Sequence, residues 1–162
     1  MERQDLIKLL AEIYYKFLTV NGYALKDKDY AIGLKEGRSK FLSNLAISKT
    51  GKYNIDSTDY ISEAAYQQLL IGNKSALVYE HMVPKTKYIQ EPLEQLVVNN
   101  QLNYEKVFHT LNKYWFTCLI TKEEDNRLNQ LKLRNKMPVD WDELNIFARY
   151  FKANIKLKTK EN

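Results

Sequence analysis

The sequence predicts a mainly α-helical domain with a small two-stranded antiparallel sheet (an α+β fold), built from about six helices and two strands. Along most of the chain, apolar residues recur at spacings of three and four, as they do on the buried face of an amphipathic helix. Two short runs, 76–83 and 115–120, are instead rich in β-branched and aromatic residues. With 162 residues, of which 44% are hydrophobic, the chain can bury one core of ordinary size.

Three helices are expected in the first part of the chain. The strongest apolar pattern covers 3–19, and Gly22 is a plausible stop after it. A weaker stripe over 28–47 carries the apolar residues Tyr30, Leu34, Phe41, Leu42 and Leu45. A third helix is expected over 58–71, started by a cap at Asp56 or Ser57 and ended by Gly72.

The middle of the chain changes character. The apolar run 76–83 is expected to be a strand, and Pro84 closes it. Pro92 suits the first turn of a short helix through Val98, because proline has no amide hydrogen to lose there. Asn103 can cap the helix that follows.

The last part of the chain is expected to hold the second strand and two helices. The run 115–120 is followed by a Thr-x-x-Glu capping box at 121–124, which predicts a helix to about residue 134. A second pattern of this kind opens a helix over 140–153. The residues 155–159 form either a short edge strand or a trailing end.

These elements are interpreted as one domain, 1–162, in three parts. A helical part covers 1–72, a ββα-like part with a helical insertion covers 73–134, and a helix with a basic tail covers 135–162. The single cysteine, Cys118, excludes an internal disulfide and a cysteine-rich zinc site. No apolar run reaches the length of a membrane span and the first residues lack a signal-peptide pattern, so we expect a cytoplasmic protein without a membrane partner.

The net charge of +5 permits a polyanionic partner without requiring one. Basic residues are concentrated between positions 26 and 52 and again between 149 and 160. We therefore predict a positive surface that contacts the phosphates of double-stranded DNA, made of Lys35, Arg38, Lys40, Lys49 and Lys52, joined by Arg149 and Lys152. The alternative is an ordinary solvated surface with a basic tail.

His81 is the candidate catalytic residue, because histidine can act as a general base near pH 7 and the chain has only two histidines. Glu80 precedes it at the end of the first expected strand. Adjacent residues on a strand point to opposite faces, so the pair needs a local bend to act together.

Two segments resemble the HNH (ββα-metal) nuclease superfamily. Glu80-His81-x-Val83-Pro84-Lys85 is similar to its first strand, where Asp-His is the usual pair, and Thr121–Asn129 is similar to the start of its helix. The resemblance implies that His81 is the general base and that Glu80 binds a divalent Mg²⁺ or Mn²⁺ ion together with a ligand from the helix, which is Asp125 or, in its place, Asn126 or Asn129. Antiparallel pairing of the two strands and a tight return at Thr121, as in the ββα arrangement of that family, further predict that His81 lies at or near solvent, close to the start of the helix at Lys122.

The sequence thus predicts a metal-dependent DNA endonuclease of HNH-like type. The alternatives are a small non-enzymatic helical binding protein, such as the adaptors or inhibitors that mobile elements encode, and a nucleic-acid-binding module whose catalytic site has decayed. The geometry separates them. Convergence of Glu80, His81 and Asp125 on one point favours the enzyme, and divergence of Glu80 and His81 favours a binding protein.

Overall fold

The computed structural model describes residues 1–51 and 57–159, which form two compact units. Unit 1 contains Met1–Lys49 and Lys85–Trp115, and unit 2 contains Thr50–Pro84 and Phe116–Asn162. The chain therefore passes from unit 1 to unit 2, back to unit 1 and again to unit 2. These boundaries differ from the divisions after residues 72 and 134 that the sequence suggested.

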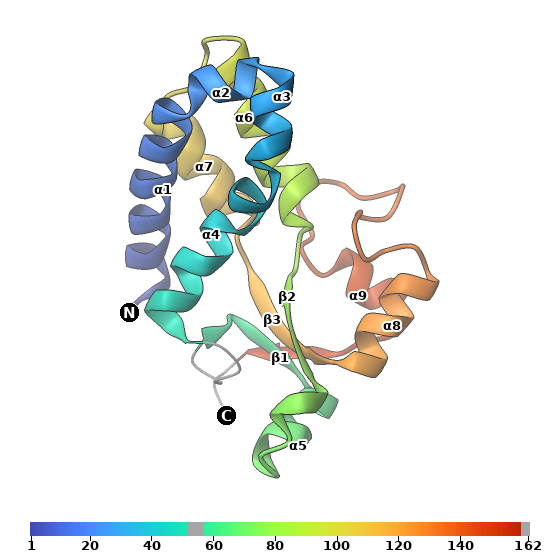
Figure 1. Cartoon of the computed structure of the whole chain (residues 1–162). Coiled ribbons are helices and arrows are strands. Elements are labelled where there is room, and N and C mark those ends of the chain that lie inside the picture. Colours follow the sequence, from blue (N-terminus) through green and yellow to red (C-terminus); the bar gives the residue numbers. More distant parts are fainter. Residues whose placement is uncertain (52–56, 160–162) are drawn as a thin grey trace. The chain divides into compact units, whose positions relative to one another are not determined.

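Unit 1 is helical (Figure 1). Its elements are α1 (Arg3–Val20), α2 (Gly22–Lys26), α3 (Lys28–Gly33), α4 (Lys35–Thr50), a π-helical turn η3 (Thr86–Gln90), α6 (Glu91–Val98) and α7 (Tyr104–Tyr114). The apolar face of α1 packs against α7 and α6. Fully buried Tyr14 and Leu10 lie in this core, and the rings of Phe17 and Phe41 stack beside it at 4.1 Å. The predicted helix over 3–19 is confirmed.

Unit 2 is built on a four-stranded mixed sheet (Figure 1). Its strands are β1 (Tyr60–Ser62), β2 (Leu77–His81), β3 (Thr117–Thr121) and β4 (Leu157–Thr159), in the order β2-β3-β1-β4. Strands β2 and β3 are antiparallel, β1 and β3 are parallel, and β1 and β4 are antiparallel. The helical elements of this unit are α5 (Glu63–Leu70), the 3₁₀ turn η2 (Lys74–Ala76), α8 (Lys122–Gln130) and α9 (Ala148–Lys152).

The predicted fold class is wrong in the extent of its sheet and in its helix number. The two expected strands do pair antiparallel, but they belong to a four-stranded sheet, and the described residues contain nine α-helices. The expected helix over 58–71 begins as β1, because Tyr60 and Ile61 pair with both β3 and β4. A strand of three residues is too short to show its own periodicity, so its neighbours decide its conformation.

Two other helices differ from their predicted bounds. The expected helix over 28–47 is divided at Leu34 into α3 and α4. Of the helix expected over 140–153, only α9 forms. The Asp142 carboxylate accepts hydrogen bonds from the amides of Leu144 and Asn145 at 2.9 and 2.8 Å, and Glu143 has a φ of 62°. This local turn competes with the helix and replaces its first part.

The helix predictions around Pro92 and Asn103 are confirmed. Helix α6 contains Pro92 in its first turn, and the Asn103 side chain caps α7 by accepting a hydrogen bond from the amide of Lys106 at 2.9 Å. Within the described part of the chain, no helix has the length and apolar content that crossing a membrane requires.

Candidate functional site

Glu80 and His81 lie on opposite faces of β2. On the Glu80 side, Val78 and Met82 pack into an apolar cluster with Leu128 of α8. On the other side, the His81 ring contacts the ring of Tyr79 edge-on at 5.8 Å. The strand stays in register through its last residue, since His81 still pairs with Thr117. The bend that would bring the two side chains together is therefore absent from this strand.

The predicted place of His81 beside the start of α8 is also wrong. The antiparallel register sets His81 opposite Thr117, at the first residue of β3, whereas Leu77 lies opposite Thr121, where α8 begins. Four residues of extended chain separate these two ends, roughly 13 Å. His81 is half-buried.

The Glu80 carboxylate is engaged by a buried arginine. Arg149 is 0% exposed, and its Nη2 atom donates to Glu80 Oε1 at 2.8 Å. The rest of the guanidinium is hydrogen-bonded to oxygens of unit 2, which belong to the backbones of His81, Met82, Leu133 and Arg134 and to the hydroxyl of Tyr150. Arg149 thus ties the end of β2 to the 133–134 segment and cannot contact a phosphate, so its predicted place on a positive surface is wrong.

The surroundings of Glu80 affect the pKa of its carboxyl in two opposite directions. Burial raises the pKa of the Glu80 carboxyl above its ordinary value, and the neighbouring Arg149 guanidinium opposes the rise. The charge of Asp125 raises the same pKa further. The Arg149 guanidinium, 2.8 Å away, is the positive charge that favours the ionised form of this carboxyl.

The residues predicted to bind a metal ion lie in different surroundings. Asp125 is 8% exposed, with Oδ2 of its carboxylate 3.2 Å from Arg134 Nη2 and Oδ1 buried without a hydrogen bond. Asn126 and Asn129 are exposed on α8. Within residues 1–51 and 57–159, no group of three or more histidine, cysteine, aspartate or glutamate side chains is placed to hold a metal ion.

Glu124 has a structural role that the sequence showed only in part. The predicted capping box is present, because the Thr121 hydroxyl accepts the Glu124 amide at 3.2 Å and the Glu124 carboxylate accepts the Thr121 amide at 2.8 Å. The same carboxylate also accepts a 2.6 Å hydrogen bond from the hydroxyl of Ser62, which caps α5 by accepting the Ala65 amide at 3.1 Å. The caps of α5 and α8 are therefore linked.

The predicted positive surface is distributed over both units. Lys35, Arg38, Lys40 and Lys49 belong to unit 1, Lys152 belongs to unit 2, and Lys52 lies outside the described residues. Several of these charges are compensated. Arg38 forms an ion pair with Glu94, Lys40 lies 2.7 Å from Glu36, and Lys152 lies 2.7 Å from Asp140.

A surface that the sequence did not predict lies at the end of α1 and on α2 and α3. Four large side chains are exposed there, which we call the α2–α3 patch: Val20 (81%), Tyr23 (78%), Tyr30 (60%) and Ile32 (61%). The rings of Tyr23 and Tyr30 meet edge-on at 6.4 Å. Tyr30 was expected on a buried stripe, and the break at Leu34 turns it to solvent instead. Comparison of the chain with protein-family models, curated proteins and solved structures gave no match.

Proposed function

We propose that this protein is a non-enzymatic binding protein, of the adaptor or inhibitor kind, that docks a protein partner on the α2–α3 patch. The observation that carries the proposal is the concentration of exposed tyrosine and aliphatic side chains between Val20 and Ile32. Exposed apolar groups gathered in one place mark interaction sites, and tyrosine is enriched among the residues that dominate binding energy.

The charges around the patch favour a protein partner over a nucleic acid. Lys26, Asp27, Lys28 and Asp29 alternate in sign along the chain and carry no net charge together, so the patch has no large excess of positive charge. A groove for single-stranded nucleic acid combines stacking rings with a clear excess of positive charge. Val20 and Ile32 offer nothing to a base or a phosphate, whereas they suit the apolar centre of a protein interface.

The backbone under the patch is held by local hydrogen bonds. The Asp27 carboxylate caps α3 by accepting the amides of Asp29 and Tyr30 at 2.9 and 3.0 Å. Lys26 Nζ donates to Asn100 Oδ1 at 2.7 Å, which joins the end of α2 to the residues after α6. A surface that is already ordered loses less conformational entropy when it binds.

The double variant Tyr23→Ser/Tyr30→Ser tests the proposal. We expect partner affinity to fall about tenfold or more, because two exposed anchor rings are removed. Stability should stay within about 0.5 kcal/mol of wild type, since both side chains are on the surface. The measurement is crosslinking in native host cells, followed by titration of the captured protein against purified wild type and variant.

The matched control is Leu70→Ser/Ile71→Ser, which removes two exposed apolar side chains from unit 2 (63% and 74% exposed). The control should keep wild-type affinity for the captured protein. Equal affinity in both double variants, or an equal loss in both, would exclude the α2–α3 patch as the docking site.

A metal-dependent nuclease is the second candidate, and one observation favours it. Asp125 Oδ1 is buried without a hydrogen bond. Its carboxylate is also near enough to Glu80, on the side of the sheet that α8 covers, for its negative charge to raise the pKa of Glu80. A carboxylate oxygen in that state is suited to a cation. Plasmid cleavage that requires Mg²⁺ or Mn²⁺ and disappears in His81→Ala would establish this candidate. Cleavage that persists in His81→Ala, or its absence from wild type, would remove it.

A further inference from the structure

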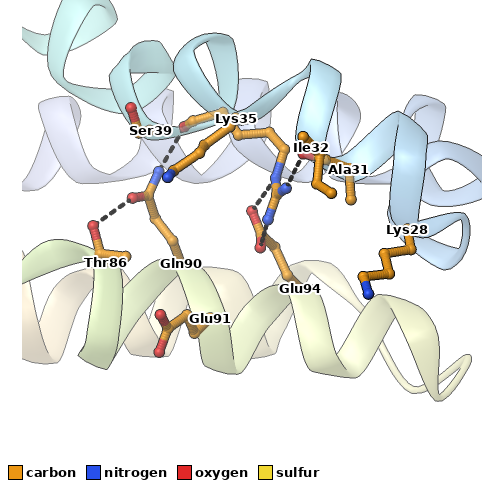
Figure 2. Close-up of a pocket in the computed structure, with 10 residues that line it drawn as sticks. Lys28, Ala31, Ile32, Lys35, Ser39, Thr86, Gln90, Glu91 and Glu94 are labelled. Atoms are coloured by element: carbon orange, nitrogen blue, oxygen red, sulfur yellow. Dashed lines mark hydrogen bonds and ion pairs between the residues drawn. The ribbon is translucent and has the colours of Figure 1, made fainter.

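A groove of about 420 Å³ runs through unit 1 between α3 and α4 on one side and η3 and α6 on the other (Figure 2). Ile32, which is part of the α2–α3 patch, also lines this groove. The groove is thus continuous with the surface on which the proposed partner docks. Its lining mixes aliphatic carbon with charged groups at both walls.

Hydrogen bonds hold the two walls of the groove together, and one further bond joins α3 to α4 within one wall. Arg38 Nε donates to Glu94 Oε1 at 3.0 Å, and Arg38 Nη1 donates to the carbonyl oxygen of Ala31 at 2.6 Å. Gln90, which is 3% exposed, donates from Nε2 to the carbonyl oxygen of Arg38 at 2.6 Å. Figure 2 shows the bonds that reach Glu94 of α6 and Gln90 of η3 from the opposite wall. The charges of Arg38 and Glu94 satisfy each other, and neither is left for a ligand.

Two lysines remain. Lys28 and Lys35 line the groove, both are exposed, and neither makes a hydrogen bond or an ion pair with another described residue. Figure 2 shows the Lys35 amine reaching over the groove towards Gln90 and the Lys28 amine turned towards α6. Ile32 lies between them on the same wall. With Arg38 and Glu94 paired, the lining keeps these two lysines against one carboxylate, Glu91 on the opposite wall, which is a net charge of +1.

We propose that this groove binds an acidic and apolar peptide segment of the protein partner, with carboxylates at Lys28 and Lys35 and an apolar side chain on Ile32. This inference rests on the proposed protein-binding function and specifies the chemistry of the partner. Charge complementarity supports it, because cations flanking an apolar side chain match a segment in which acidic and apolar residues alternate. A lysine amine pairs with a single carboxylate without the planar geometry that arginine demands.

The test is a titration of the full chain by amide chemical shifts in NMR. The probe is a short capped peptide that alternates leucine and glutamate, and the matched probe has glutamine in place of glutamate. We expect the glutamate peptide to shift the amides of Ile32 and Lys35 and to bind about tenfold more tightly than the glutamine peptide. Lys28→Glu/Lys35→Glu should abolish the difference.

The control variant Lys8→Glu/Lys122→Glu changes the net charge equally at two exposed lysines outside the groove, and it should bind the glutamate peptide as wild type does. Equal binding of the two peptides, unshifted groove amides, or an equal loss in the control would overturn the inference. The Tyr23→Ser/Tyr30→Ser experiment reports separately. Suppose that partner binding is lost in Tyr23→Ser/Tyr30→Ser but the peptide does not shift the groove amides. The proposed protein-binding function would then be supported, and only the inference that the groove binds an acidic segment would be rejected.

Discussion

Replacing Arg149 by methionine is expected to lower the free energy of unfolding by about 3–5 kcal/mol. Methionine fills part of the volume, but it leaves the half-buried Glu80 carboxylate without its ion-pair partner and the carbonyl groups of Met82 and Leu133 without their donor. A buried charge that loses its partner carries its full desolvation cost. Urea denaturation followed by circular dichroism measures the change.

Arg127→Met is the matched control for this prediction. The Arg127 side chain also donates to backbone oxygens, those of Ala153 and Asn154, at 3.2 and 3.3 Å, but it is exposed. Its loss should cost less than about 1 kcal/mol. The double variant Arg149→Met/Glu80→Met should recover much of the stability lost in Arg149→Met, because it removes the unpaired charge. Equal costs for Arg149→Met and Arg127→Met would contradict the structural role of the Glu80–Arg149 pair.

The second large effect is expected at Glu124. Glu124→Ala removes the carboxylate that accepts both the Thr121 amide and the Ser62 hydroxyl, and it leaves Ser62 buried at 0% exposure with its donor unpaired. A lost cap and an unsatisfied buried hydroxyl together should cost about 2–3 kcal/mol. Thermal unfolding of the variant gives the measurement.

Glu123→Ala provides the comparison within the same helical turn. Glu123 is exposed, and its carboxylate interacts favourably with the helix dipole alone, so its loss should cost about 0.3–1 kcal/mol. If Glu123→Ala proves as destabilising as Glu124→Ala, the linked caps of α5 and α8 do not contribute as described.

Local patterns predicted the parts of the fold that depend on neighbouring residues. The apolar spacing of α1, the Asn103 cap and the capping box at Thr121 act within one or two turns, and each was readable from the sequence. The antiparallel pairing of β2 with β3 also followed from composition. Strand β1 did not, because its conformation depends on partners more than fifty residues away in the sequence.

The candidate site was predicted less well for a similar reason. Arg149 stands in a stretch of basic residues of the kind usually found on a surface. Its burial depends on partners distant in the sequence, among them Glu80, sixty-nine positions earlier. The resemblance implied that Glu80 and Asp125 bind one metal ion, and in the structure they pair with Arg149 and Arg134 respectively. It could not show that His81 faces away from Glu80, since that depends on the strand staying in register to its last residue.

Thermal unfolding with and without millimolar Mn²⁺ tests most directly whether Arg149, rather than a metal ion, balances the negative charge of the Glu80 carboxylate. A ligand that binds only the native state raises its stability, so an occupied metal site must raise the midpoint temperature Tm. With Glu80 held by Arg149, wild type is predicted to show the same Tm in Mn²⁺ as in a chelator. A Tm that rises in Mn²⁺ for wild type, and not for Glu80→Gln or Asp125→Asn, would contradict this account and establish a metal centre between β2 and α8.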